Sequence, residues 1–153
     1  MSHDFKIVEL AEQPGLAIRE TVSNSEIPAK MKEFFGELWR FIKAGNVEIA
    51  GPPFALYHSW NERDTVVEVG FPVGPGAVGE GRIQAMALPG GKVVTGMHAG
   101  PYEKLVDSYH AMMAWMKANG HEPAGRMWET YLTDPEMEKD PAKWLTQMFW
   151  PVA

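Results

Sequence analysis

The same order of motifs occurs twice in this chain, and this duplication restricts the possible folds more than any other feature. The first copy contains a Pro-Gly step, a helix-like segment, AGPPFALY and FPV, at positions 14–15, 28–43, 50–57 and 71–73. The second contains the same elements as Pro-Gly, a helix-like segment, AGRMWETY and WPV, at positions 89–90, 101–119, 124–131 and 150–152. Corresponding positions lie 74 or 75 residues apart, rising to 79 at the last tripeptide. Two copies this short are expected to share a core.

The composition is that of one compact domain. The 153 residues are 45% hydrophobic and 22% charged, and none is cysteine. The absence of cysteine excludes disulfides, thiolate nucleophiles and cysteine-ligated zinc. No apolar run approaches the roughly 18 residues of a membrane helix, and the N-terminus lacks a signal pattern. We therefore expect a single domain over 1–153, with no membrane association and a cytoplasmic location.

The charge pattern argues against direct binding to nucleic acid. The net charge is −6 and the chain has no cluster of Lys and Arg, which contacts with phosphates would require. The five histidines show no HExxH motif or paired spacing, and no GxSxG motif occurs. We expect no cofactor and no metal site, and the acidic balance tolerates a cationic ligand.

In repeat one, about 1–73, hydrophobic periodicity predicts a strand-strand-helix-strand-strand order. The strands are expected at Phe5–Leu10, Leu16–Val22, Phe54–Trp60 and Thr65–Val73, with a Pro14-Gly15 turn between the first two. Apolar residues at intervals of three and four predict a helix over Pro28–Lys43, capped by Ser25 and ended by Gly45. The glycine-rich segment 74–81 is interpreted as the linker.

Repeat two, about 82–153, is expected to follow the same order. Its strands are predicted at Arg82–Leu88, Lys92–His98, Met127–Leu132 and Trp144–Trp150, with a long acidic loop between the last two. A helix is predicted from Pro101 to Asn119, with Gly120 as a left-handed cap. Its expected buried stripe consists of Leu105, Val106, Tyr109, Met112, Met113 and Met116.

Glu129 is the main candidate for a functional residue. Side chains alternate along a strand, so Met127, Glu129 and Tyr131 share one face and Trp128 lies on the other. A carboxylate among apolar neighbours is exposed, paired, protonated or ready for a cation, and a salt bridge to a nearby basic residue is the plain alternative. The first copy has Ala55 at the equivalent position, so generic repeat packing does not require the acid.

Two motifs within this duplicated plan carry a family resemblance. The helix entry His98-Ala99-Gly100-Pro101-Tyr102 and the strand Glu129-Thr130-Tyr131-Leu132 resemble the GyrI-like small-molecule-binding superfamily. That superfamily includes effector-binding domains of multidrug-responsive transcription activators and a stand-alone gyrase-inhibitory protein. The resemblance implies an α+β fold in which duplicated strand-helix-strand-strand repeats form one curved antiparallel eight-stranded sheet with two main helices.

The resemblance also implies a ligand cleft where the two halves meet. It places Glu129 in that cleft, with Tyr131 and Tyr102 at aromatic lining positions. Aromatic faces attract cations and a carboxylate supplies the counter-charge, so a lipophilic, cationic or aromatic ligand is expected. Core packing is the alternative for each further candidate lining residue. These further candidates are Tyr57, Trp60, Trp39, Trp128 and Phe149.

Three functions stay open at this point. The first is a stand-alone small-molecule-binding protein, because repeat one starts near Met1 and leaves no room for a DNA-binding module. The second is a hydrolase that opens strained cyclopropane-type cytotoxins, with Glu129 activating water and Tyr102 or Tyr131 stabilising the oxyanion. The third resembles the gyrase inhibitor and acts on an unknown protein partner, with the acidic loop Asp134–Asp140 as the candidate patch. Whether the chain is an enzyme is left open.

Overall fold

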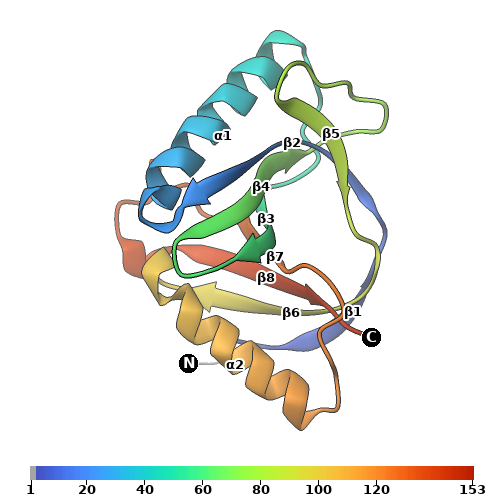
Figure 1. The fold of residues 1–153 in the computed structure, drawn as a ribbon, viewed down its shortest axis with the longest axis vertical. Coiled ribbons are helices and arrows are strands. Elements are labelled where there is room, and N and C mark those ends of the chain that lie inside the picture. Colours follow the sequence, from blue (N-terminus) through green and yellow to red (C-terminus); the bar gives the residue numbers. More distant parts are fainter. Residues whose placement is uncertain (1–2) are drawn as a thin grey trace. The chain divides into compact units, whose positions relative to one another are not determined.

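The computed structural model describes residues 3–153 and has the expected fold class. Within this range, eight β-strands form an antiparallel sheet, accompanied by two α-helices and three short 3-10 helices (Figure 1). Among the described residues, no helix is long and apolar enough to cross a membrane. The contacts divide the chain into two compact units. We call Ala11–Gly90 the first unit, and the residues up to Leu10 together with Gly91–Ala153 the second unit.

The first unit is a four-stranded antiparallel layer with one helix on it. Its strand order is β3-β4-β2-β5, with bounds Phe54–Trp60, Asp64–Pro72, Gln13–Ser23 and Ile83–Leu88. Helix α1, Ile27–Ala44, packs against β2 and β4 (Figure 1). Its buried side chains recur every four residues and are all apolar: Phe34, Leu38 and Ile42.

The second unit repeats this arrangement. Its strand order is β1-β6-β8-β7, with bounds Lys6–Leu10, Gly91–Ala99, Leu145–Pro151 and Trp128–Tyr131. Helix α2, Leu105–Ala118, packs against β6 and ends before Gly120, whose φ of +75° is the left-handed cap expected from the sequence. The side chains that α2 buries are Leu105, Ser108, Met112 and Met116.

The compact units do not coincide with the two sequence repeats, because each unit contains one strand from the other repeat. Strand β1 comes first in the chain but pairs with β6 of the second unit, where Val8 lies opposite Val93. Strand β5 pairs with β2 of the first unit, where Leu16 lies opposite Ala85. Each unit is therefore completed by a strand that the sequence places in the other repeat.

The turn expected at Pro14-Gly15 is wrong, because both residues lie inside β2. The Pro14 carbonyl accepts a hydrogen bond from the Val73 amide at 2.9 Å, which ties this stretch to the end of the first repeat. A Cβ on Gly15 would lie 2.9 Å from Met86 Sδ, so the glycine permits close strand packing here rather than a turn.

The expected start signals of both helices are also wrong. Ser25 lies in the 3-10 turn Asn24–Glu26 and makes no side-chain cap to α1. Pro101 is extended, and a 3-10 turn at Tyr102–Lys104 separates it from the start of α2.

Two members of the buried stripe predicted for α2 are exposed. Val106 and Met113 face outward, while Ser108 takes a buried position that the sequence pattern did not assign to it. Ser108 tolerates burial because its hydroxyl is hydrogen-bonded to His98 Nδ1 at 2.6 Å and to His3 Nε2 at 3.0 Å. A polar residue therefore interrupts the apolar period of α2, with one partner on the preceding strand and one 105 positions away.

Candidate functional site

Glu129 lies in the middle of β7 and is almost completely buried, with 2% of its surface exposed. An exposed position, one of the plain alternatives, is therefore excluded. Opposite Glu129 on β8 is Met148, which packs in the apolar cluster with Met112 and Met116 of α2. Directly opposed residues of an antiparallel pair point to the same face, so Glu129 lies on the α2 side of its sheet.

Two tyrosines bind the carboxylate. Tyr109 of α2 donates its hydroxyl proton to Glu129 Oε1 at 2.7 Å, and Tyr131 of β7 donates to Oε2 at 2.7 Å. Both bonds have the short length typical of hydroxyl donors to a carboxylate. An ionised carboxylate only accepts hydrogen bonds, so these two donors are compatible with a charged Glu129.

Aromatic rings continue outward from these two tyrosines. The ring centroid of Tyr102 lies 5.6 Å from that of Tyr131 and 4.9 Å from that of Trp144. Tyr102 is 36% exposed, so this row runs from the buried carboxylate toward the surface. Burial raises the pKa of Tyr102, and the negative charges of Glu129 and Asp134 add to this effect. The neutral phenol is therefore the favoured form beside Glu129.

Two predicted lining residues of the second unit lie on another face of its sheet. Trp128 neighbours Glu129 in sequence and points to the opposite side of β7, as strand alternation requires. Its ring stacks on Phe149 at 5.1 Å, with an interplanar angle of 10°. Trp128 is buried, and this pair therefore forms a separate aromatic contact from the tyrosines around Glu129.

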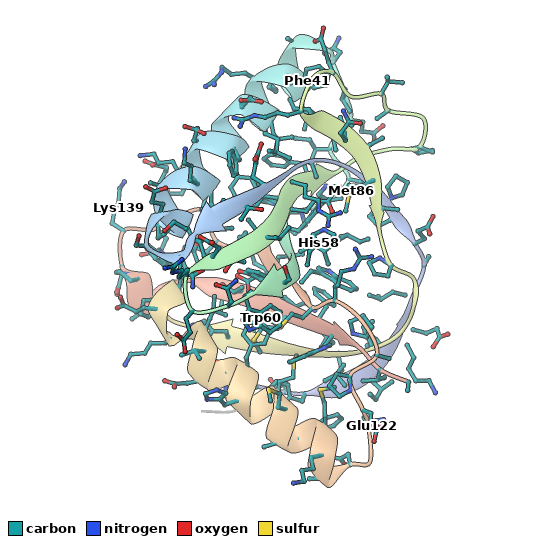
Figure 2. The ribbon with its side chains drawn as sticks, viewed as in Figure 1. Phe41, His58, Trp60, Met86, Glu122 and Lys139 are labelled. Carbon is teal, nitrogen blue, oxygen red and sulfur yellow. The ribbon has the colours of Figure 1, made fainter. Side chains whose placement is uncertain are left out.

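The remaining predicted lining residues belong to the first unit. Trp39 of α1 is exposed and packs on Phe71 at 6.1 Å. Trp60 is exposed at the end of β3, and Tyr57 is half-buried on the same strand. Figure 2 labels Trp60 together with His58, whose Nε2 lies 2.8 Å from Glu68 Oε1.

Two contacts of the site involve residues that the sequence analysis did not propose for it. Tyr109 had been assigned only to the buried stripe of the second helix, yet it binds Glu129 directly. Trp150 meets the Tyr109 ring edge-on, with centroids 6.2 Å apart and an interplanar angle of 77°. The aligned repeats contain a sequence signal for Tyr109. Phe35 lies 74 positions before Tyr109 and lacks its hydroxyl, just as Ala55 lies 74 positions before Glu129 and lacks its carboxylate.

The acidic loop between β7 and β8 uses its carboxylates locally. Asp134 Oδ1 accepts from the Glu136 amide at 2.9 Å, and Asp140 Oδ1 accepts from the Ala142 amide at 3.1 Å. The Trp144 indole donates to the Glu138 carbonyl at 2.8 Å and so anchors the loop beside Tyr102. Part of the acidity of the loop therefore serves turn formation.

Other features of the surface do not coincide with Glu129. A hollow of about 360 Å³ lies at the end of α2, and its lining includes Met113, Met116 and His121. A second hollow is lined by residues of the first unit between Ser23 and Asp64. Residues 3–153 contain no cluster of three or more metal-ligating side chains suited to a metal ion.

Comparison with known proteins shows the family. The model of the GyrI-like small molecule binding domain matches residues 3–153, and the chain therefore belongs to this family. The crystal structure of the EcmrR C-terminal domain has a TM-score of 0.87 and 26% identity, covering 100% of this chain and 99% of that one. In the cryo-EM structure of the EcmrR–DNA complex, the match has a TM-score of 0.86 and 27% identity and covers 99% of this chain but 58% of the longer EcmrR chain.

More distant structures share the fold. A structure described as a hydrolase from Listeria innocua has a TM-score of 0.66 and 17% identity, covering 99% of this chain and 93% of that one. SAV2435 bound to tetraphenylphosphonium has a TM-score of 0.67 and 12% identity, covering 98% and 94%. The comparison with curated proteins gives no match.

Proposed function

We propose that this chain binds small lipophilic compounds, cationic or aromatic, with Glu129 as the central counter-charge. The observation that carries the proposal is the buried carboxylate whose two oxygens are held by Tyr109 and Tyr131, with the rings of Tyr102 and Trp144 leading outward. Aromatic faces attract a cation by about 0.5 to 2 kcal/mol each, depending on desolvation. A carboxylate held in place among such rings favours cations over neutral compounds of the same shape.

Binding is better supported than the two alternatives. Tyrosine hydroxyls bind both oxygens of Glu129, and this arrangement fixes the position of a counter-charge, whereas the hydrolase alternative also needs a water molecule within reach of the same oxygens. For a protein-interaction regulator, the candidate patch is the acidic loop Asp134–Asp140, in which three carboxylates accept hydrogen bonds from backbone amides. The contacts of Glu129 and of the acidic loop therefore give less support to the hydrolase and to the protein-interaction regulator than to ligand binding.

The test uses two probes of matched shape and opposite charge. Tetraphenylphosphonium, the compound bound to the fold relative SAV2435, is compared with tetraphenylborate by thermal shift and calorimetry. The wild type is expected to bind the cation and not the anion. Glu129→Gln, which preserves size, is expected to lose at least tenfold in affinity for the cation. Glu136→Gln, in the exposed loop, is the matched control and should bind normally.

Two results would contradict the proposal. One is equal binding of both probes, which would show that charge at Glu129 does not select the ligand. The other is cation binding that survives unchanged in Glu129→Gln while the variant is folded. Turnover of a strained electrophile by the wild type, lost in Glu129→Gln, would instead support the hydrolase alternative.

A further inference from the structure

We propose that Thr146 and Trp150 form a hydrogen-bonding part of the Glu129 site, which recognises a carbonyl or ether oxygen of the ligand. This inference rests on the proposed function and deepens it, because it adds a polar requirement to a lipophilic cationic or aromatic ligand. Both residues lie on β8 in the second unit.

The starting observation is that both side chains carry an unsatisfied polar group. Thr146 is fully buried, and its Oγ1 has no hydrogen-bond partner within residues 3–153. The Nε1 of Trp150 is also buried and has no partner in the same range. Buried polar atoms are nearly always hydrogen-bonded, so two such groups on one strand need an explanation.

Strand register places both groups on the Glu129 side of the sheet. Met148 lies opposite Glu129, and Thr146 and Trp150 are two residues before and after it, so all three face the same way. Thr146 is directly opposite Tyr131, which binds one oxygen of Glu129. The Trp150 ring contacts Tyr109, which binds the other oxygen. Each of the two tyrosines therefore neighbours one residue that carries an unsatisfied group.

The first unit shows that packing does not demand these polar atoms. At the positions corresponding to Thr146 and Trp150, 79 residues earlier, it has Val67 and Phe71. Phe71 meets Phe35 with centroids 5.8 Å apart at 76°, nearly the geometry in which Trp150 meets Tyr109. Valine matches threonine in shape. The same packing is thus built in one unit from hydrocarbons and in the other with a hydroxyl and an indole N–H.

The chemistry of the two groups defines what they recognise. An indole N–H only donates a hydrogen bond, while a threonine hydroxyl donates or accepts. Both groups suit an acceptor, and a carbonyl or ether oxygen supplies one without adding a charge. Residues four positions apart on a strand lie about 13 Å apart, so a given oxygen bonds to one of the two groups and not to both. Sites that hydrogen-bond one ligand group discriminate strongly against analogues that lack it. The expected ligand therefore carries such an oxygen near its cationic or aromatic part.

The test compares two probes that differ by one carbonyl. Phenacyltriphenylphosphonium carries a C=O where phenethyltriphenylphosphonium carries a CH2. Their affinities are measured by calorimetry at about pH 5, where the acidic CH2 of the phenacyl compound keeps its proton and both probes are cations. The wild type is expected to bind the phenacyl compound about fivefold to tenfold more tightly, the worth of one net hydrogen bond. In the double variant Thr146→Val with Trp150→Phe, this ratio should fall to about one, and the ratio is the readout because the loss of the indole ring can change both affinities. The single variants then assign the ratio to one donor.

A stability measurement separates this role from a structural one. Removing an unsatisfied buried hydroxyl should leave the ligand-free Thr146→Val protein at least as stable as the wild type. Thr130→Val, on the other face of β7, is the matched control and should keep the wild-type ratio. A lower Tm for Thr146→Val, or equal losses of affinity for both probes, would indicate that the hydroxyl holds the fold.

The outcomes distinguish this inference from the proposed function. If neither probe binds the wild type, the proposed function fails and this inference fails with it. If both probes bind the wild type equally, or the double variant keeps the preference for the carbonyl, only the inference is overturned. A crystal structure of the phenacyl complex in which a water molecule, and not the ligand, bonds to Thr146 and Trp150 would overturn it as well.

Discussion

The two units share one plan but differ in what lies between helix and sheet. The buried positions Phe34, Leu38 and Ile42 of α1 correspond, 74 residues later, to Ser108, Met112 and Met116 of α2. In the first unit these helix positions are hydrocarbon, and so are Ala55, Val67 and Phe71 on the strand face that packs against them. In the second unit a polar group appears at several of them, although the fold is the same.

The polar differences are concentrated around one residue. Comparing first unit with second, the paired positions are Ala55 with Glu129, Phe35 with Tyr109, Val67 with Thr146 and Phe71 with Trp150. Each pair replaces a hydrocarbon side chain by one that carries an O–H, N–H or carboxylate. Because the first unit has the same fold without them, the fold plan alone does not explain these groups, and the contrast is consistent with the proposed ligand site.

The largest expected effect comes from moving the carboxylate into the hydrocarbon unit. Ala55→Glu places an acid at a fully buried position where Phe35 cannot supply the hydroxyl that Tyr109 supplies to Glu129. We expect a loss of about 3 kcal/mol or more in the free energy of unfolding, from burial of a charge without sufficient donors. Urea unfolding at pH 7 measures it.

A double variant tests whether the missing donor is the cause. Ala55→Glu with Phe35→Tyr should recover part of the loss, with a coupling energy of about 1 kcal/mol or more between the two sites. If the single variant Ala55→Glu is as stable as the wild type, a buried carboxylate in the first unit does not need a tyrosine donor. The proposed link between Glu129 and Tyr109 in the second unit would then be wrong.

The next effect is the removal of one tyrosine hydroxyl from the second unit. Tyr109→Phe converts that position to the phenylalanine of the first unit and leaves Glu129 with one fewer donor. We expect a loss of about 1.5 to 3 kcal/mol, the range for hydrogen bonds to charged groups. Chemical denaturation measures the change, with Tyr102→Phe as the half-exposed control that should change stability by much less. Equal effects of the two variants would contradict the special role of Tyr109.

A smaller effect is expected when a hydroxyl is added to the first unit. Val67 is fully buried, and Val67→Thr keeps the side-chain shape while adding an unsatisfied polar atom. The expected loss is about 1 to 3 kcal/mol, in the direction opposite to Thr146→Val. A lower Tm for Val67→Thr together with an unchanged or higher Tm for Thr146→Val would support the contrast between the two units. A higher Tm for Val67→Thr would contradict it.

Some features of the fold can be predicted from the sequence and others cannot. The eight strands, two helices and the Glu129–Ala55 contrast could be predicted, because each follows from local periodicity or from aligning the two copies. The exchange of β1 and β5 between units could not, since strand pairing is a tertiary choice that no local pattern encodes. The burial of Ser108 could not be predicted either, because it depends on tertiary contacts with His98 of β6 and with His3, which lies 105 positions away.

The site itself was predicted only in part. Alignment of the two copies singles out Glu129 against Ala55, and it also pairs Phe35 with Tyr109, which differ by one hydroxyl. The aromatic lining residues are predicted from residue type alone, and residue type does not determine the face of the sheet on which a side chain lies. Trp128 illustrates this, because it adjoins Glu129 in sequence and yet stacks with Phe149 on the opposite side of the strand.

The smallest predicted effect concerns charges that the first unit keeps on its surface. Arg82 contacts Glu37 through two nitrogens, at 2.7 and 3.0 Å, and lies 3.6 Å from both Glu20 and Glu33. The hydrogen bond from Arg82 is the main cause that lowers the pKa of Glu37, and it raises the pKa of Arg82. Since these side chains are substantially exposed, Arg82→Gln should cost only about 0.5 to 1 kcal/mol.

Salt and pH separate this surface network from the buried carboxylate. A lowered pKa means that the contribution of Glu37 is fully present above its ordinary pKa of 4.5 and is lost as the pH falls through the lowered value. Urea unfolding of Arg82→Gln and wild type should therefore differ at pH 7 in low salt, and converge in about 1 M salt or below that pH window. The cost of Tyr109→Phe should persist in 1 M salt, because a buried hydrogen bond is screened little. A salt-sensitive Tyr109→Phe would mean that water reaches Glu129 as freely as it reaches Glu37, and the contrast between the two units would then fail.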